Sequence, residues 1–182
     1  MVSTYINYFR QLAVGHKDIK HDQLAEGNQG DPERKKFTTW GADEAITGLK
    51  TSVGFTALFL EMFELVTRGD NPFGVRGSYK GAISIFDRVA MDDFADQSNK
   101  AQTCYRILEE ILRQIWQDHY GKDKNRCSTP FAKFNFNELD INYVGPLFDN
   151  VYGWRCEFSF EPLHTLNLQK APEGVFELKV ES

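Results

Sequence analysis

Residues 152–160 are Tyr-Gly-Trp-Arg-Cys-Glu-Phe-Ser-Phe, and apolar and polar side chains alternate along them. A period of two is typical of a β-strand that buries one face. A second aromatic alternation lies at 131–136, and an amphipathic stretch precedes both at 97–119. This order predicts a long helix followed by a two-stranded antiparallel ribbon. The alternation builds a sheet face and gathers no cluster of reactive side chains, which favours a protein that packs against copies of itself over an enzyme.

The composition is that of a globular domain with extensions. The chain has 182 residues, of which 41% are hydrophobic and 14% aromatic, and 15 are phenylalanine. This is enough apolar material for one substantial core. The formal net charge is -5, which argues against a nucleic-acid-binding surface, because such a surface needs a basic patch to release counterions.

Cysteine usage and hydropathy bear on localisation. The three cysteines, Cys104, Cys127 and Cys156, are odd in number and widely spaced, which fits buried thiols in a reducing compartment. No run approaches the roughly 18 apolar residues of a membrane span. Residues 1–14 lack the continuous apolar segment of a signal peptide. We therefore expect synthesis in the cytoplasm and no membrane association.

The remaining patterns predict the order of elements. From the N-terminus we expect a helix capped by Ser3 and ended at Gly15, a polar stretch at 17–36, a short strand at 37–40 and a short helix after Asp43. A strand at 55–66, a glycine-rich loop at 68–78 and a strand at 79–90 follow. After the long helix we expect strands at 132–143 and 152–162, and a tail in which 175–180 can form one more strand.

These elements predict an α+β fold, with a small antiparallel β-sheet of about four strands packed by the long α-helix. An N-terminal helix and a C-terminal arm flank it. We divide the chain into an N-terminal helix and polar loop arm (1–36), an α+β core domain (37–162) and a C-terminal extension (163–182).

The long helix has one core-facing stripe at helical spacing. Its members are Ala101, Cys104, Tyr105, Leu108, Ile111, Leu112, Ile115 and Trp116. Just before it, Asp92, Asp93 and Asp96 place negative charge where the helix dipole favours it. These carboxylates therefore need no catalytic explanation.

From Phe55 to Phe63 the odd positions are mostly apolar, and Glu61 is the exception. If that strand is buried, an ionised Glu61 needs a partner such as Arg88 or Arg155. An edge position with Glu61 in solvent is the alternative.

The sequence contains few of the patterns that indicate metal, cofactor or catalytic sites. His16 and His21 lie outside any clear helix, and no CxxC motif occurs. We expect no metal, no cofactor and no enzymatic activity. One alternative is a small metal-dependent hydrolase that uses Asp92, Asp93, Glu61 and His119. Another is a single-stranded nucleic-acid-binding module on the aromatic strands, although core packing explains those aromatics better.

The arrangement resembles a known family. The helix from Gln97, the polar connector, the strand near Phe134 and the closing stretch 150–160 are similar to tail-completion and tail-terminator proteins of tailed bacteriophages. The stretch 8–19, followed by His21, is similar to uncharacterised proteins of phages and prophage-like elements of Bacteroidetes-type gut hosts, including crAss-like phages. The polar stretch 17–36 and the tail after Pro162 depart from the simplest members, and both fit inter-subunit arms that become ordered on assembly.

The resemblance implies a structural virion protein of the phage neck, a head–tail connector or tail terminator. Such proteins form rings, commonly of six or twelve subunits, that join the portal or adaptor to the tail and let DNA pass through the lumen without specific binding. Sheet edges, the loop 68–78 and the tail 175–180 would contact the neighbouring subunit. The residues expected at the subunit interface, as large apolar residues in loops or termini, are Trp40, Phe73, Tyr79 and Phe176.

Overall fold

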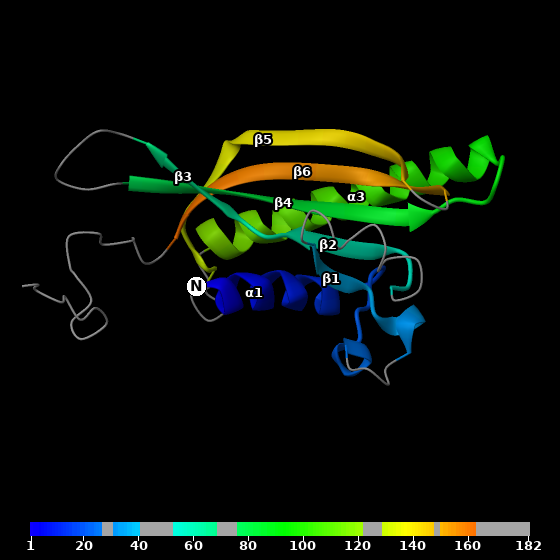
Figure 1. Ribbon diagram of the computed structural model, residues 1–182, viewed down its shortest axis with the longest axis horizontal. Coiled ribbons are helices and arrows are strands. Elements are labelled where there is room, and N and C mark those ends of the chain that lie inside the picture. The colour runs from blue at the N-terminus through cyan, green and yellow to red at the C-terminus, as the bar shows by residue number, and fades with distance from the viewer. Residues whose placement is uncertain (27–30, 41–52, 69–75, 122–128, 148–149, 163–182) are drawn as a thin grey trace, which may run out of the picture.

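The computed structural model of the protein describes residues 1–26, 31–40, 53–68, 76–121, 129–147 and 150–162 (Figure 1). In chain order the elements are α1 (Val2–Gly15), the short 3-10 helices η1 (Gln23–Glu26) and η2 (Pro32–Arg34), β1 (Phe37–Trp40), β2 (Ala57–Glu61), β3 (Glu64–Arg68), β4 (Arg76–Arg88), α3 (Phe94–Tyr120), β5 (Phe131–Leu147) and β6 (Val151–Pro162). The predicted α+β class is confirmed. The helix expected after Asp43 and the strand expected at 175–180 lie outside the described residues. Neither α1 nor α3 combines the length and apolar character that crossing a membrane requires.

Among the described residues the sheet has six strands, in the order β1-β2-β4-β6-β5, with β3 paired to β4 next to β2. This corrects the expected sheet of about four antiparallel strands in two respects. There are more strands, and β1 lies parallel to β2, with Phe37 opposite Leu58. Residues 41–56 separate the two strands, 16 in all. That length suits the crossover of about a dozen or more residues that a parallel pair needs.

The strand predicted at 55–66 is broken once, by a bulge. Both β2 and β3 pair antiparallel with β4, Leu60 opposite Ile83 and Glu64 opposite Lys80. Three residues, 61–63, therefore face two, 81 and 82, which makes one extra residue on the outer strand. The extra residue reverses the alternation, so that Phe63 joins Leu58 and Leu60 on the inner face of the sheet.

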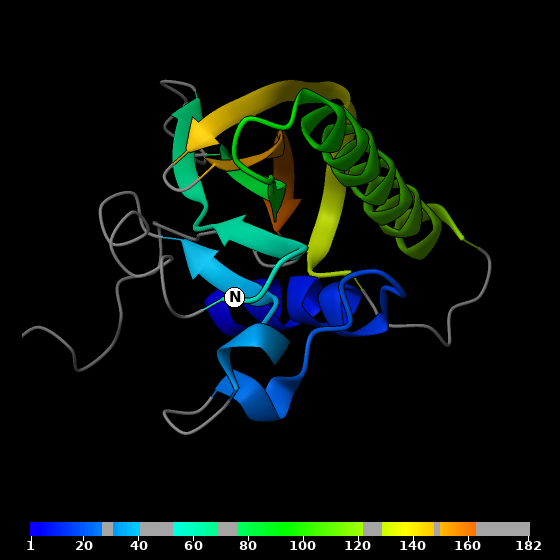
Figure 2. The same ribbon diagram turned by 90° about the vertical axis from the view of Figure 1, so that its right-hand side faces the viewer.

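The main core lies between the inner face of the sheet and both helices. Figure 2 shows the sheet curving so that α1 lies beneath it and α3 beside it. From α1, Tyr5 and Phe9 are buried against the aromatic side chains Phe131, Phe158 and Phe160. The core thus extends to α1, before the boundary expected at residue 37.

A smaller apolar cluster lies on the other face of the sheet. Its members are Val53, Ala57, Phe59, Phe86 and Val151. Because alternate residues of β2 and β4 enter different clusters, both faces of the central strands are covered by apolar side chains.

Helix α3 begins at Phe94, three residues before the expected start, and ends at Tyr120. The Asp93 carboxylate caps it by accepting from the Asp96 N–H at 2.9 Å, and the Asp96 carboxylate accepts from the Ala90 N–H at 2.8 Å. The expected role of these carboxylates at a helix start is confirmed. By contrast, α1 follows Met1 with no side-chain cap, so the cap predicted at Ser3 is wrong, whereas its end at Gly15 is confirmed.

Gly81 makes the closest contact between α1 and the sheet possible. The Tyr5 hydroxyl passes over Gly81 and donates to the Glu61 carbonyl oxygen at 3.1 Å. A Cβ at Gly81 would lie 2.5 Å from the Tyr5 hydroxyl oxygen and 3.1 Å from the Phe158 ring. Burial, with the Glu61 carboxylate nearby, raises the pKa of Tyr5, so that the hydroxyl stays protonated and remains a donor.

Gly81→Ala is expected to destabilise the protein by about 1–3 kcal/mol, because the new methyl group overpacks this contact. In the double variant with Tyr5→Phe, part of that loss should be recovered, since the oxygen that blocks the methyl group is gone. Urea unfolding of the single and double variants measures the coupling. Gly15→Ala is the matched control, since nothing lies within 4 Å of its Cβ position. An equal cost of Gly81→Ala with and without the Tyr5 hydroxyl contradicts this account.

Candidate functional site

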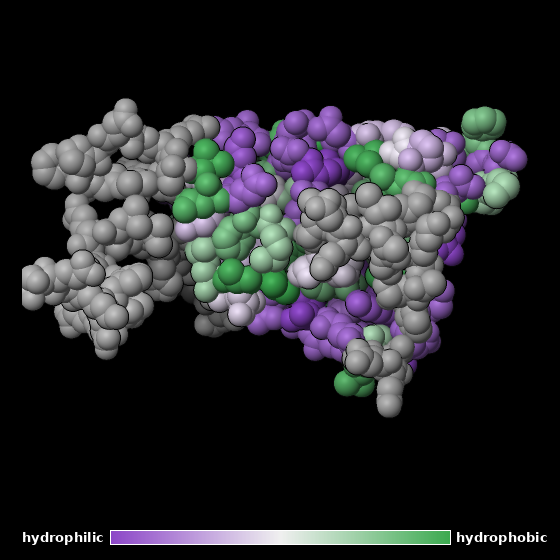
Figure 3. All heavy atoms as spheres, in the orientation of Figure 1, coloured by the Kyte–Doolittle hydropathy of each residue, from purple (hydrophilic) through white to green (hydrophobic). Residues whose placement is uncertain are grey.

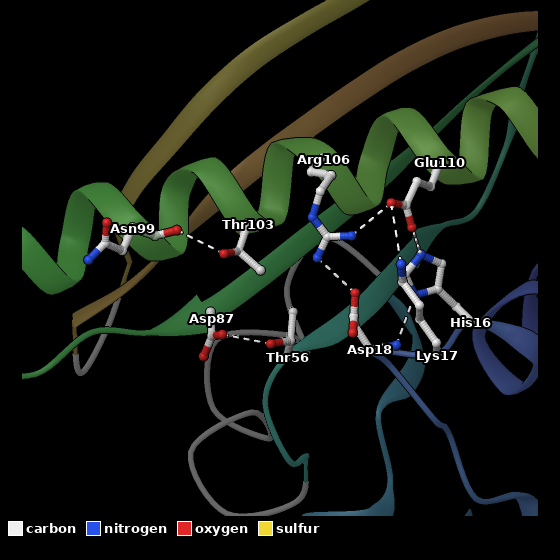
Figure 4. Close-up of polar contacts among 9 residues, drawn as sticks. All are labelled: His16, Lys17, Asp18, Thr56, Asp87, Asn99, Thr103, Arg106 and Glu110. Carbon is white, nitrogen blue, oxygen red and sulfur yellow. Dashed lines mark hydrogen bonds and ion pairs between the residues drawn. The ribbon is translucent and has the colours of Figure 1, made fainter.

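A polar network ties the end of α1 to the middle of α3 (Figure 4). Arg106 donates to the Glu110 carboxylate and to the Asp18 carboxylate, both at 2.7 Å. His16 Nε2 lies 3.0 Å from the second oxygen of Glu110. We call these four residues the Arg106 network. They come from the turn after α1 and from one face of α3, because Arg106 and Glu110 lie four residues apart on the helix.

Arg106 pairs with both carboxylates of the network, and the Lys17 ammonium lies 3.9 Å from the Glu110 carboxylate. Hydrogen bonds from Arg106 lower the pKa of Asp18 and of Glu110, and the same bonds raise the pKa of Arg106. Both carboxylates are therefore ionised at neutral pH and already hold a cation. Neither carboxylate is left poised to donate a proton at neutral pH.

The same residues are the one group in the described chain with the spacing of metal ligands. Potential ligand atoms of His16, Asp18 and Glu110 lie within 4.8 Å of one another. However, the Asp18 N–H donates to His16 Nδ1 at 3.2 Å. The ring proton therefore sits on Nε2, facing Glu110. A metal at Nε2 would require that proton on Nδ1, against the Asp18 N–H, and would compete with Arg106. The arrangement is that of an ion-pair network rather than a metal centre.

A groove with a volume of about 740 Å³ runs between α1 and α3 beside this network. Tyr8 donates to Asp118 at 3.0 Å at one end, and His16 meets Glu110 at the other. The two links are eight residues apart on each helix, which fits antiparallel helices in register. Gln114 also donates to Asp118, at 2.7 Å. Tyr8, Gln114 and Asp118 of the groove are thus paired with one another, and Gln11 and Lys17 are its exposed polar side chains.

The residues of the hydrolase hypothesis do not come together. Asp93 and His119 lie at opposite ends of α3, 26 residues and therefore ~39 Å apart. Asp92 is next to Asp93, and Glu61 ends β2 on the sheet. Burial lowers the pKa of His119, whose ring lies 3.5 Å from the Thr129 hydroxyl. These four side chains form no common site.

Glu61 has the partner that the sequence suggested. Arg155 donates to both oxygens of the Glu61 carboxylate, at 2.5 and 2.7 Å, and also to Glu157. These bonds raise the pKa of Arg155. Of the two candidates, Arg88 and Arg155, the second is confirmed. The pair links β2 to β6 across β4 and explains Glu61 without chemistry.

Two of the thiols and several aromatic side chains are also buried in the core. Burial raises the pKa of Cys104 and of Cys156 to about 12, so neither thiol is a nucleophile at neutral pH. Phe134, Phe158 and Phe160 are buried under the helices. They are therefore not exposed for base stacking, as a single-strand-binding surface requires.

The four residues expected at a subunit interface are placed as follows. Trp40 ends β1, a strand at the border of the sheet. Tyr79 is only 6% exposed and stacks on Phe160, which gives it a place in the core. Phe73 and Phe176 lie outside the described residues.

An exposed aromatic pocket was missed by the sequence analysis. Trp116, predicted on the core-facing stripe, is 51% exposed, and Tyr120 is 56% exposed. Their rings are 5.6 Å apart, and Tyr120 is 5.9 Å from Phe136 of β5. Ile107 takes a core position that the predicted stripe omitted. A stripe centred on Ile107, Ile111 and Ile115 would have placed Trp116 at the rim of the helix face.

No family model matches this chain, and no match was found among curated proteins or solved structures.

Arg106→Gln is expected to lower the free energy of unfolding at pH 7 by roughly 0.5–1 kcal/mol, a value discounted for the partial exposure of the network. The folded-state pKa values of Asp18 and Glu110 are lowered, so their stabilisation is present above the ordinary carboxylate range and lost as pH falls through the folded values. The difference between wild type and variant should therefore shrink between about pH 4 and pH 2. Urea unfolding across that range measures it.

Lys133→Gln serves as the control for Arg106→Gln. It removes an exposed pair with Glu161, whose charged atoms are 3.7 Å apart, and should change stability little at any pH. A cost of Arg106→Gln that stays constant down to pH 2 argues that the side chain acts through packing rather than through charge.

Proposed function

We propose that this protein is a non-enzymatic structural subunit that assembles into a ring in the neck of a tailed phage virion, as a head–tail connector or tail terminator. The family in this proposal comes from the sequence resemblance. The assembly role is supported by where the polar and apolar side chains of the described residues lie.

Most of the candidate reactive side chains among the described residues make structural contacts. Arg106 holds the carboxylates of Asp18 and Glu110, the thiols of Cys104 and Cys156 are buried, and Glu61 is held by Arg155. A catalytic site is expected to keep at least one titratable group poised for reaction in a cleft. In the described residues these polar side chains instead form hydrogen bonds and ion pairs that hold α1, α3 and the sheet together.

Large apolar side chains are exposed at the two ends of α3, and this observation carries the proposal. Met91 and Phe94 lie at its start, and Trp116 and Tyr120 lie in its last turns. Figure 3 shows a hydrophobic projection at the end of the molecule where α3 begins. Exposed aromatic side chains of this kind are enriched at protein–protein interfaces.

The long edge of the sheet is less suited to pairing with another subunit. Strand β5 pairs with β6 alone among the described strands, but its register shifts at three places. Its exposed residues include Lys133, Glu138 and Asp140, and Pro146 removes a backbone donor. Bulges, charges and proline are the features that protect an edge from association. The ends of the molecule are therefore favoured over this edge as contact surfaces.

The net charge of -5 suits a ring through which DNA passes. A basic lumen would bind the phosphate backbone and hold it through counterion release. An acidic subunit instead avoids retention of the DNA.

Purified protein should form closed annular particles of uniform subunit number, alone or with the portal or tail-tube protein encoded beside it. Negative-stain electron microscopy shows the annulus, and native mass spectrometry counts the subunits, for which we expect six or twelve. Dissociation on dilution separates specific assembly from aggregation. A chain that stays monomeric at every concentration and with every neighbouring head and tail protein contradicts the proposal.

A further inference from the structure

A rigidly presented apolar projection marks the start of α3. Phe94 is 83% exposed and Met91 is 80% exposed; with Leu24, at 89%, they are the most exposed large apolar side chains in the described chain. The backbone around them is fixed, because Asp93 caps the helix and Asp96 accepts from the Ala90 N–H. A pre-organised backbone reduces the conformational freedom that is lost on binding. We call Met91 and Phe94 the knob.

A pocket of about 420 Å³ lies at the other end of α3. Its apolar walls are Trp116 and Tyr120 of α3 and Phe136 of β5, with Phe134 also lining it. Its polar rim is formed by Lys133, Asn135 and Asn137 of β5. This volume lies in the range of pockets that hold a small ligand, ~300–1,000 Å³, and it accepts a phenyl ring with room for a second side chain.

The charges at the two ends are complementary. Asp92 lies beside the knob, and Arg113 lies one helical turn before Trp116, on the same helix face. Neither has an ion-pair partner among the described residues. Lys133 adds a second cation at the pocket, partly offset by Glu161 at 3.7 Å. Opposite charges at the rim guide association and fix the register of a contact.

The two features cannot meet within one molecule. Phe94 and Tyr120 are 26 residues apart on one helix, or ~39 Å. A projection on one end that fits a pocket on the other makes a heterologous contact between copies. Such contacts repeat from subunit to subunit, and they close into a ring when the rotation between neighbours allows it.

We propose that the knob of one copy, Met91 and Phe94, inserts into the pocket of the next copy, formed by Trp116, Tyr120 and Phe136. Asp92 of the first copy then faces Arg113 of the second. This assignment rests on the proposed ring assembly and names its subunit contact. The occupant of the pocket is a second copy of this chain, because the projection, the pocket and the matching charges are all present on it.

Two variants test the contact from its two sides. Phe94→Glu removes the aromatic side chain of the knob and places there a residue that is favourable at a helix start. Trp116→Ala removes a wall of the pocket and keeps helix propensity. Each variant alone should associate at least ~10-fold more weakly than wild type, as expected for an aromatic hot spot. Sedimentation velocity measures association, and a cooperative thermal unfolding transition shows that each variant is folded. Leu24→Ser, an equally exposed apolar residue elsewhere, is the control and should assemble as wild type does.

Mixing the two variants separates this contact from other modes of association. Phe94→Glu retains an intact pocket and Trp116→Ala retains an intact knob, so one sound contact forms between them. The mixture should give a 1:1 pair and nothing larger, counted by native mass spectrometry. A mixture that forms no pair, or that forms full rings, overturns the knob-and-pocket assignment.

The remaining outcomes distinguish the two proposals. If wild type forms rings and both variants form them equally well, the assignment of the contact is wrong while the proposed function stands. If wild type forms no assembly, alone or with its neighbouring virion proteins, both fail.

Discussion

The packing of α1 against the sheet is the contact on which the rest of the structure depends. Tyr5 and Phe9 meet Phe131, Phe158 and Phe160, at ring separations between 5.5 and 6.4 Å. Each such aromatic pair contributes about 0.5–1.5 kcal/mol beyond the burial of its area. Gly81 supplies the space that lets the Tyr5 hydroxyl reach the Glu61 carbonyl. This contact holds the N-terminal helix in the same core as the last strand.

Once α1 is in place, it fixes α3. The Arg106 network and the Tyr8–Asp118 hydrogen bond hold the two helices at points eight residues apart. From the other side, Cys104, Ile107, Leu108, Ile111 and Ile115 are buried against the sheet. A helix held along its whole length presents its two ends in a fixed relation. Helix α3 is therefore held rigidly, with an apolar projection at one end and an aromatic pocket at the other.

The parts of the fold that depend on local pattern were predictable from the sequence. The alternation at 152–160 predicted β6, the helical spacing after Gln97 predicted α3, and the acidic residues before it marked its start. The parallel pairing of β1 with β2 was not predictable, because local sequence patterns do not specify which strand a distant segment pairs with, or in which direction. The bulge at 61–63 shifts the alternation by one residue and was not predicted, because the pattern of 55–66 indicated one continuous strand.

Functional residues were harder to predict than elements, because they are brought together from distant parts of the chain. His16 and Glu110 are 94 residues apart, and so are Glu61 and Arg155. The sequence offered Arg88 and Arg155 as partners of Glu61 because a charge in a buried strand requires one, and the structure pairs it with Arg155. Nothing in the sequence indicated that His16 or Asp18 requires a charged partner. Trp116 was assigned to the core because its spacing fits either the edge or the centre of a helix face.

The central claim is that the ends of α3, and not a reactive pocket, carry the function of this protein. Hydroxyl-radical footprinting of wild type, as dilute monomer and as purified assembly, tests it most directly, because methionine and aromatic side chains are among the most reactive. We predict that Met91, Phe94, Trp116 and Tyr120 become protected together in the assembly, while Leu24 and Tyr143 keep their monomer reactivity. Unchanged reactivity of those four side chains in the assembled particle would contradict the account.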